Sequence, residues 1–227
     1  MVAVYYYFSP SSSGVVEPTP TSYLESPVVL EEAPTLSAYP GVAAEPTDLP
    51  LLDSPENLIG LIAGHRGYDS GTVCEDGLTE VQITSELAEK VSALLLKEGI
   101  VAETLNEFDP RLDGYQAMAL VALHIDSCDY INDLASGYKI SASDSVNSGV
   151  LSTCVQEAYG KATGLRYHPN SITPEMAGYH AFTDIDSETP GIIIEVGFLN
   201  LDRQILTERL DIVARGIFDG IMCYVDT

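Results

Sequence analysis

Leu58-Ile59-Gly60-Leu61-Ile62-Ala63-Gly64-His65 is a short apolar run that ends in a glycine and a histidine. Apolar runs of this length are typical of strands buried on both faces of a parallel sheet. Two similar runs follow: residues 119–123 precede His124, and residues 191–194 precede Glu195. In open α/β folds, ligands bind at the carboxyl ends of the strands. The three runs therefore predict a buried sheet with polar side chains along one rim.

From residue 58 onward the chain alternates between strand and helix patterns. Strands are expected at 58–64, 100–105, 121–125, 137–141, 177–182 and 191–196. Helices are expected from Thr79 to a glycine stop at Gly99, then at 112–119, at 150–161 and, continuous or broken, at 201–224. This alternation predicts an α/β fold with a single, mostly parallel, twisted sheet and helices on both faces.

Residues 1–57 differ from the rest in composition. They hold nine of the 13 prolines and eight acidic residues, and they contain no Lys or Arg. Such a segment buries too little apolar surface to offset the entropy of ordering, so we expect an extended, largely irregular linker over 1–57 and one domain over 58–227. The linker is either a spacer or a dispensable tail. The apolar opening 1–8 lacks the basic start of a signal peptide and could be the end of an upstream membrane anchor.

The formal net charge of −24 is extreme for 227 residues. Nucleic-acid partners need Lys and Arg to contact phosphates, and only 10 such residues are present, so we exclude nucleic acid. The same scarcity disfavours docking on anionic lipid through a basic patch. Most of the acidic residues are expected to form a solvated surface.

His65, Glu80, His124 and Glu195 together suggest a catalytic zinc ion and its general base. Each residue alone is ambiguous. A histidine after a strand is often structural, and a glutamate in a first helical turn often interacts favourably with the helix dipole. A carboxylate directly after Ile192-Ile193-Ile194 is more informative, because burying it without a partner is costly.

The chain has four cysteines, and no two of them are spaced as in a structural zinc knot. An even number suits two disulfides in an oxidising compartment, and three pairings are possible. Cys74 lies between His65 and Glu80, and Cys128 follows His124 by four residues, so these cysteines are neighbours if those three side chains meet at one metal. We therefore favour Cys74–Cys128 with Cys154–Cys223. The alternative is four buried free thiols.

Four motifs share their order and approximate spacing with one enzyme family. They are Gly64-His65-Arg66-Gly67-Tyr68-Asp69-Ser70-Gly71, Leu78-Thr79-Glu80, Ala122-Leu123-His124-Ile125-Asp126 and Glu195-Val196-Gly197-Phe198-Leu199-Asn200. Through them, residues 58–226 resemble the zinc-dependent N-acetylmuramoyl-L-alanine amidases, the type-3 peptidoglycan amidases. That family has GHGG-x-D-x-G after the first strand, a Glu at the first helix, S-x-H at a strand end and a late E-x-G-F-x-x-N.

The resemblance implies that His65, Glu80 and His124 bind Zn²⁺ and that Glu195 is the general base. The reaction implied is hydrolysis of the amide between N-acetylmuramic acid and L-alanine in peptidoglycan. We accordingly expect a monomer that acts outside the cytoplasmic membrane, either secreted or anchored through the linker. The alternatives are another zinc-dependent peptidase that acts on cell-wall peptides, or an inactive domain that binds glycan or a partner.

The sequence departs from the family pattern at several positions. Arg66 replaces the second glycine of GHGG, Ala122 replaces the serine of S-x-H, and Asp126 replaces an asparagine. Asp126 tunes the metal, or orients His124 as a hydrogen-bond acceptor, or is an exposed loop residue. The arginines that the family often carries before this strand are missing from 104–106, although Arg111 is near. The segment between His124 and Glu195 is too short for a large occluding insertion, so we expect an open groove.

Further polar residues are candidates for the groove. We expect substrate contacts from Arg66, Asp126, Arg166 and His168, although a polar surface loop is the simpler interpretation of 166–171. His180 either faces the site or is a half-buried histidine with its hydrogen bonds satisfied.

Overall fold

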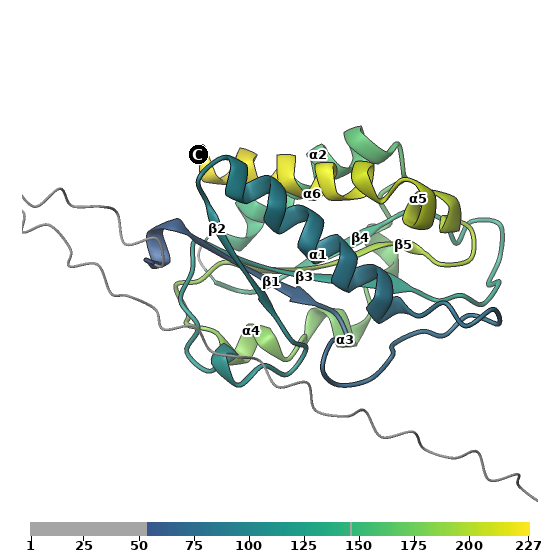
Figure 1. Cartoon of the computed structure of the whole chain (residues 1–227), viewed down its shortest axis with the longest axis horizontal. Helices are drawn as coiled ribbons and strands as arrows, with labels where there is room; N and C mark the ends of the chain where they lie inside the picture. The colour runs from purple at the N-terminus through teal and green to yellow at the C-terminus, as the bar shows by residue number, and fades with distance from the viewer. Residues whose placement is uncertain (1–53, 146) are drawn as a thin grey trace, which may run out of the picture. The chain divides into compact units, whose positions relative to one another are not determined.

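The computed structural model describes residues 54–145 and 147–227, which form a five-stranded sheet between two helical layers (Figure 1). The strands are β1 (Leu58–Ala63), β2 (Val101–Leu105), β3 (Ala119–Asp126), β4 (Lys139–Ala142) and β5 (Gly191–Phe198). Their order is β2-β1-β3-β5-β4, and only β4 runs antiparallel to its neighbour. The predicted single, mostly parallel sheet with helices on both faces is confirmed.

The two faces of the sheet carry helical layers of different size. The helices are α1 (Glu80–Lys97), α2 (Ser148–Thr163), α3 (Pro174–Ala177), α4 (Ala181–Asp184), α5 (Arg203–Glu208) and α6 (Leu210–Val225). Single 3-10 turns lie at Pro55–Asn57, Pro110–Leu112 and Pro169–Ser171. In Figure 1, α1, α2 and α6 lie above the sheet, whereas α3 and α4 lie below it.

Successive residues of a strand point to opposite faces, so the inner strands β1, β3 and β5 each contribute to two hydrophobic cores. Leu123 and Ile194 pack under the large helical layer, whereas Ala122 and Ile193 belong to the smaller core near α3 and α4. Both faces of the sheet are therefore buried, which explains why the strands are continuous apolar runs.

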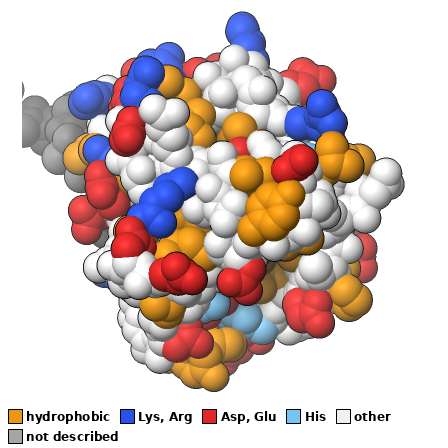
Figure 2. All heavy atoms as spheres, turned by 90° about the vertical axis from the view of Figure 1, so that its right-hand side faces the viewer, with side chains coloured by type: hydrophobic (Ala, Val, Ile, Leu, Met, Phe, Trp, Pro, Cys, Tyr) orange, Lys and Arg blue, Asp and Glu red, His pale blue; other side chains and the backbone are white. Residues whose placement is uncertain are grey.

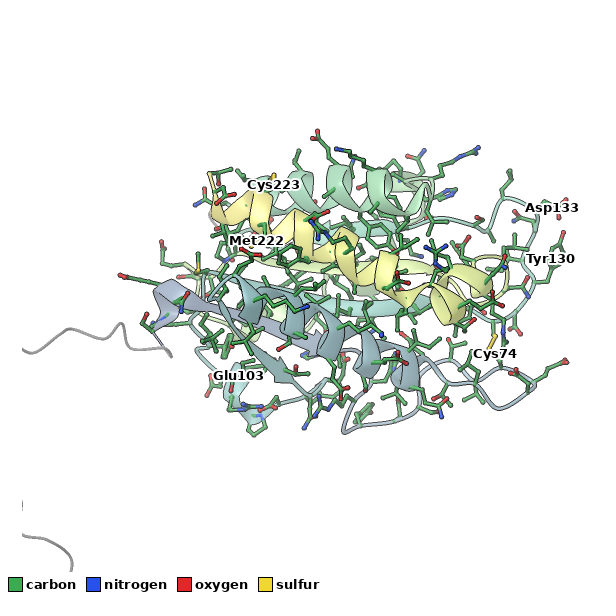
Figure 3. All side chains as sticks on the ribbon, turned by 45° about the horizontal axis from the view of Figure 1, so that its top comes forward. Cys74, Glu103, Tyr130, Asp133, Met222 and Cys223 are labelled. Atoms are coloured by element: carbon green, nitrogen blue, oxygen red, sulfur yellow. A yellow bond between two sulfur atoms is a disulfide. The ribbon has the colours of Figure 1, made fainter. Side chains whose placement is uncertain are left out.

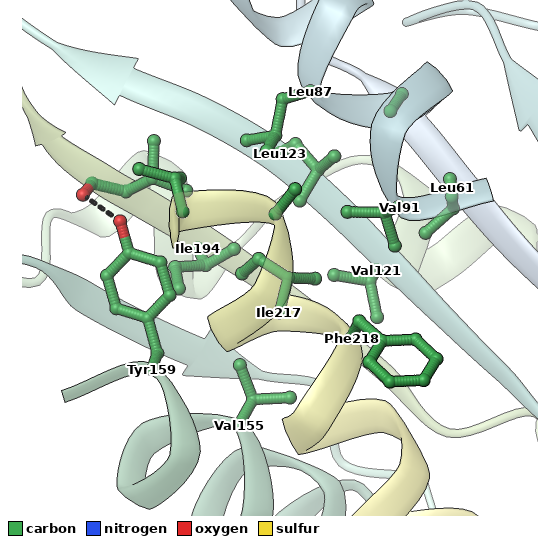
Figure 4. Close-up of a cluster of buried hydrophobic side chains, with 14 of the residues drawn as sticks. Leu61, Leu87, Val91, Val121, Leu123, Val155, Tyr159, Ile194, Ile217 and Phe218 are labelled. Atoms are coloured by element: carbon green, nitrogen blue, oxygen red, sulfur yellow. Dashed lines mark hydrogen bonds between the residues drawn. The ribbon is translucent and has the colours of Figure 1, made fainter. Parts of the chain in front are cut away.

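Helices α2 and α6 pack closely, and Figure 4 shows part of the core beneath them. Tyr159 of α2 is fully buried, and its hydroxyl donates a 2.5 Å hydrogen bond to the Val196 carbonyl of β5. At Gly220 of α6, a Cβ atom would lie 2.5 Å from Val155 Cα. The absence of a side chain at Gly220 therefore permits this helix spacing.

The structure joins Cys74 to Cys128 and Cys154 to Cys223, the pairing favoured from the sequence. Cys74–Cys128 ties the loop before α1 to the segment after β3, and Cys154–Cys223 joins α2 to α6. Figure 3 shows Cys74 and Cys223 at opposite ends of the domain. The two disulfides therefore constrain different parts of the fold.

Several sequence expectations need correction. The helix expected at 112–119 is absent, because only 110–112 form a single 3-10 turn and β3 begins at Ala119. The strand expected at 177–182 is wrong, because α3 and α4 occupy this segment. His124 and Glu195 lie within β3 and β5 rather than after them. The C-terminal helix is broken at Arg209, between α5 and α6.

Most of the expected linker, residues 1–53, lies outside the described residues, as does the apolar opening 1–8. The described part begins at residue 54, immediately before the first 3-10 turn and β1. Within residues 54–145 and 147–227, no helix combines the length and the apolar character that a membrane span requires. The domain boundary at 57/58 stays a prediction.

Candidate metal centre

His65, Glu80 and His124 meet at the rim of the sheet, and one donor atom from each lies within 4.8 Å of the other two. His65 follows β1, Glu80 is the first residue of α1, and His124 lies near the end of β3. Glu80 Oε2 is 3.3 Å from His65 Nε2, and Glu80 Oε1 is 3.3 Å from His124 Nδ1. The carboxylate therefore lies between the two imidazole rings.

The loop after β1 requires unusual backbone geometry to bring these side chains together. His65 has φ 66°, in the left-handed region that non-glycine residues seldom adopt. A Cβ atom at Gly71 would lie 2.6 Å from Glu80 Oε2 and 2.7 Å from His65 Cδ2. At Gly64 it would lie 2.8 Å from His124 Nδ1. The two glycines therefore leave open the space around the donor atoms.

Helix α1 holds Glu80 as a carboxylate. The Thr79 N–H donates to Gln82 Oε1 at 3.0 Å, which caps the helix start. Both Glu80 oxygens accept backbone N–H groups, from Thr72 at 3.1 Å and from Ile125 at 2.9 Å. Burial alone would raise the pKa of Glu80, but the hydrogen bonds from the two histidines and the Ile125 N–H lower it to about 2.

The histidines present different ring nitrogens to Glu80. His65 Nδ1 lies 2.6 Å from Asp69 Oδ1, which leaves Nε2 facing Glu80. His124 presents Nδ1 to Glu80 and points Nε2 to the opposite side. Burial opposes a charge on His124, but Glu107 and Glu80 outweigh it and raise its pKa to about 10. This surplus of negative charge favours a cation among the three side chains.

Two imidazole nitrogens and one carboxylate oxygen form a donor set that suits a divalent transition metal such as Zn²⁺. The open space at Gly64 and Gly71 and the buried carboxylate fit such an ion. Three protein ligands would leave a coordination position for water. The residues present therefore fit a metal of the catalytic type.

Glu195 lies next to this cluster on β5. The strand register pairs it with His124 on one side and with Lys139 on the other. Its Oε2 atom is buried and has no hydrogen-bond partner among the described residues. Burial raises the pKa of Glu195 to about 7. The charge of His124 opposes this rise, and the charge of Glu80 adds to it. A carboxyl group with this pKa exchanges protons near neutral pH, as a general acid–base requires.

Glu107 is a fifth polar residue of the centre, which the sequence analysis missed. It is 5% exposed, and its Oε2 accepts the His65 N–H at 2.8 Å and lies 3.3 Å from His124 Nε2. Its Oε1 accepts the Tyr179 hydroxyl at 2.9 Å and lies 3.1 Å from His180 Nε2. Glu107 follows β2 by two residues, so its place at the carboxyl end of a parallel strand could have identified it.

The expected substrate residues lie in two places. Asp126, Arg166 and His168 line one cavity of about 390 Å³, whereas Arg66 follows His65 and is not among its lining residues. Lys139 lines the same cavity and pairs with Asp126. Asp126 is therefore not an exposed loop residue, because it lies within β3 and pairs with Lys139. The carboxylate nearest to His124 Nε2 is that of Glu107.

Two other features of this face bear on the site. His180 faces the site, because its Nε2 contacts Glu107 Oε1. Its ring stacks on Phe108, with ring centroids 4.3 Å apart. Figure 2 shows histidine side chains at the surface of this face, between acidic and hydrophobic side chains. A larger cavity of about 700 Å³ lies between α2 and α6, and none of the candidate metal ligands lines it.

Solved structures with a similar fold include several N-acetylmuramoyl-L-alanine amidases. N-acetylmuramoyl-L-alanine amidase from Clostridium difficile 630 superposes with a TM-score of 0.61 at 20% identity, over 77% of this chain and 99% of that one. AmiC2 of Nostoc punctiforme gives a TM-score of 0.57 at 21% identity, over 77% and 99%. The catalytic domain of CwlV from Bacillus (Paenibacillus) polymyxa var. colistinus gives 0.56 at 22%, over 75% and 98%.

These structural likenesses show the fold. No curated protein matches the chain by sequence. The model of the N-acetylmuramoyl-L-alanine amidase family matches residues 59–223, which include all four motif segments and both disulfides. The chain therefore belongs to the N-acetylmuramoyl-L-alanine amidase family.

Proposed function

We propose that His65, Glu80 and His124 bind Zn²⁺ and that Glu195 is the general base of the family's reaction. That reaction is hydrolysis of the amide between N-acetylmuramic acid and L-alanine in peptidoglycan. The observation that supports the assignment is the convergence of three donor side chains beside a buried carboxyl group of raised pKa. Zinc, when bound, would lower the pKa of a coordinated water to about 7 and polarise the scissile carbonyl.

The chain's own residues then have separate roles. Glu80 and the two histidines hold the metal at the strand ends, with Glu80 held by two backbone N–H groups. Glu195 accepts a proton from the attacking water and returns it to the nitrogen of L-alanine as the amide C–N bond breaks. The raised pKa of Glu195 suits both steps, because the carboxyl group must gain and lose the proton near neutral pH.

The cavity lined by Lys139, the residue that the strand register pairs with Glu195, is our candidate for the stem-peptide subsite. Arg166, His168 and Lys139 supply cationic or hydrogen-bonding groups there, and Asp126 supplies a carboxylate. A stem peptide carries carboxylates and free amino groups, which this mixture matches. We propose that Arg66, on the loop after β1, also contacts the substrate.

An amidase of the cell wall acts outside the cytoplasmic membrane, and two disulfides suit an oxidising compartment. We propose that the protein is secreted, or is held at the envelope by a membrane tether upstream of the linker at 1–57. We propose further that it acts as a monomer.

The deciding experiment combines metal analysis with digestion of purified peptidoglycan and mass spectrometry of the products. One zinc per chain and free peptides that begin at L-alanine are expected. Glu195→Gln should keep zinc and lose the products, whereas Glu157→Gln, an exposed change on α2, should keep both. Cleavage inside the stem peptide would instead indicate a peptidase. A wild-type chain without zinc or products would indicate a binding domain.

A further inference from the structure

Glu107 connects three separate parts of the chain to the metal centre. Its Oε2 accepts the backbone N–H of His65, 42 residues away, and its Oε1 accepts the hydroxyl of Tyr179, 72 residues away. The carboxylate is buried, and the same Oε2 lies 3.3 Å from Nε2 of His124, in a third part of the chain. Glu107 is therefore a buried carboxyl group held by hydrogen bonds beside the candidate ligands.

The ring of His124 lacks a hydrogen bond where it faces Glu107. Its Nδ1 atom faces Glu80, the side on which the three donor atoms converge. Its Nε2 atom is buried and has no hydrogen-bond partner among the described residues, and Glu107 Oε2 lies 3.3 Å away. A buried ring N–H needs an acceptor, because burial removes the water that would otherwise accept its hydrogen bond. Glu107 is the carboxylate within reach.

We propose that Glu107 is a positioning residue for His124: its carboxylate accepts the Nε2–H, so that Nδ1 carries no proton and points at the metal. The inference rests on the proposed ligand set. Asp69 stands in the same relation to His65, whose Nδ1 lies 2.6 Å from Asp69 Oδ1. Metal-binding histidines commonly donate their second ring N–H to a carboxylate, which fixes the tautomer and the ring orientation. Each histidine of the site therefore has its own carboxylate.

The other carboxylate oxygen of Glu107, Oε1, contacts the segment between α3 and α4. Tyr179 and His180 both face Glu107 Oε1, at 2.9 and 3.1 Å. His180 is held in turn by Asp184, 3.3 Å from its Nδ1, and by stacking on Phe108. These contacts keep the carboxylate from rotating away from His124. His180 thus supports the site through Glu107.

The test is zinc affinity of the full chain, measured by competition with a chromogenic chelator. Glu107→Met removes the acceptor and should weaken zinc binding by about 10- to 100-fold, with a smaller loss for Glu107→Gln. His124→Ala is the reference for loss of a ligand. Glu157→Met is the matched control, because it makes the same substitution at an exposed glutamate on α2, away from the candidate ligands. It should change zinc affinity less than threefold.

Nuclear magnetic resonance of the zinc-loaded protein supplies a second readout. The wild type should show His124 protonated at Nε2 with slow proton exchange, and Glu107→Gln should exchange this proton faster. Stability in urea of the metal-free variants separates folding from positioning. Unchanged zinc affinity and an unchanged His124 proton in Glu107→Gln would overturn the inference, and that variant decides the matter if Glu107→Met does not fold. Tight zinc binding by His124→Ala would instead reject the ligand set itself.

Discussion

Lys139 Nζ lies 2.5 Å from Asp126 Oδ2, across the strand that carries Glu195. Asp126 belongs to β3 and Lys139 to β4, and β5 runs between them. The register places Lys139 directly opposite Glu195. Among the charges that act on Glu195, Asp126 raises its pKa and Lys139 lowers it. The ion pair therefore balances two opposite influences on the proposed base.

Lys139→Met should disturb this balance. The change leaves Asp126 as an uncompensated charge, so the pKa of Glu195 should rise and activity at pH 7 should fall several-fold, with recovery at higher pH. The change should also destabilise the fold. Breaking a fully buried ion pair costs about 3–5 kcal/mol, and the cost here should be smaller because Asp126 is partly exposed. Rate profiles against pH and urea unfolding measure the two effects.

The exposed variant Lys161→Met is the control for this prediction, and it should leave both quantities unchanged. Adding Asp126→Asn to Lys139→Met should restore part of the activity and stability, because it removes the unpaired charge. An unshifted pH profile in Lys139→Met would contradict the assigned influence on Glu195.

The pKa of Glu195 predicts how stability of the metal-free protein changes with pH. Its folded pKa, about 7, lies above the ordinary value of 4.5, so folding favours the protonated form. This contribution is fully present below pH 4.5 and is lost as pH rises through 7. The shift corresponds to about 3 kcal/mol. Between pH 4 and pH 8, the free energy of unfolding of Glu195→Gln should therefore rise by up to that amount relative to the wild type. Urea unfolding with chelator present measures this difference. Parallel curves for the two proteins would refute the raised pKa.

The two disulfides should differ in their effect on zinc. They span similar separations, 54 and 69 residues, so loss of either should cost a similar 2–5 kcal/mol of stability. Only Cys74–Cys128 joins the loop before Glu80 to the segment after His124. Replacing both of its cysteines by alanine should weaken zinc binding at least fivefold.

The matched control for that prediction is replacement of Cys154 and Cys223 by alanine. It removes the bond between α2 and α6 and should leave zinc affinity within twofold of the wild type. Equal losses of affinity in the two double variants would show that the metal centre responds only to global stability.

Gly220→Ala should destabilise the fold. The added Cβ would lie 2.5 Å from Val155 Cα, a backbone atom, so α2 and α6 must move apart. Overpacking of this kind costs about 1–3 kcal/mol. Gly149→Ala is the control, because no atom lies within 4 Å of its Cβ position and alanine is the better helix former. Thermal unfolding should rank Gly149→Ala at or above the wild type and Gly220→Ala below it. The opposite order would contradict the packing argument.

The sheet and its polar rim could be predicted because their signals are local. Each buried strand is a continuous apolar run, and a parallel sheet brings the carboxyl ends of such runs to one edge. Hence His65, His124 and Glu195 could be grouped before any contact was known. Glu80 could be added because a helix start has a recognisable sequence, Leu78-Thr79-Glu80 and its capping residues.

The errors arose where tertiary packing, and not a regular element, produces the apolar spacing. Leu112 and Tyr115 are buried in the smaller core from an irregular loop, so their spacing imitates a helix face. Tyr179 and Ala181 alternate with less buried residues because two short helical turns meet there, which imitates a strand. Glu107 was not identified because its partners other than His124 lie 42 to 73 residues away in sequence.

The strand order of the sheet also determines which strands unfold locally first. The outermost strands, β2 and β4, each have one neighbour, whereas β1, β3 and β5 each have two. His65, His124 and Glu195 belong to these three inner strands or directly follow them. Fraying begins at exposed edges and termini, where little is lost by opening. We therefore expect the backbone around these residues to be among the slowest in hydrogen exchange, so that their geometry survives fluctuations that loosen the margins of the fold.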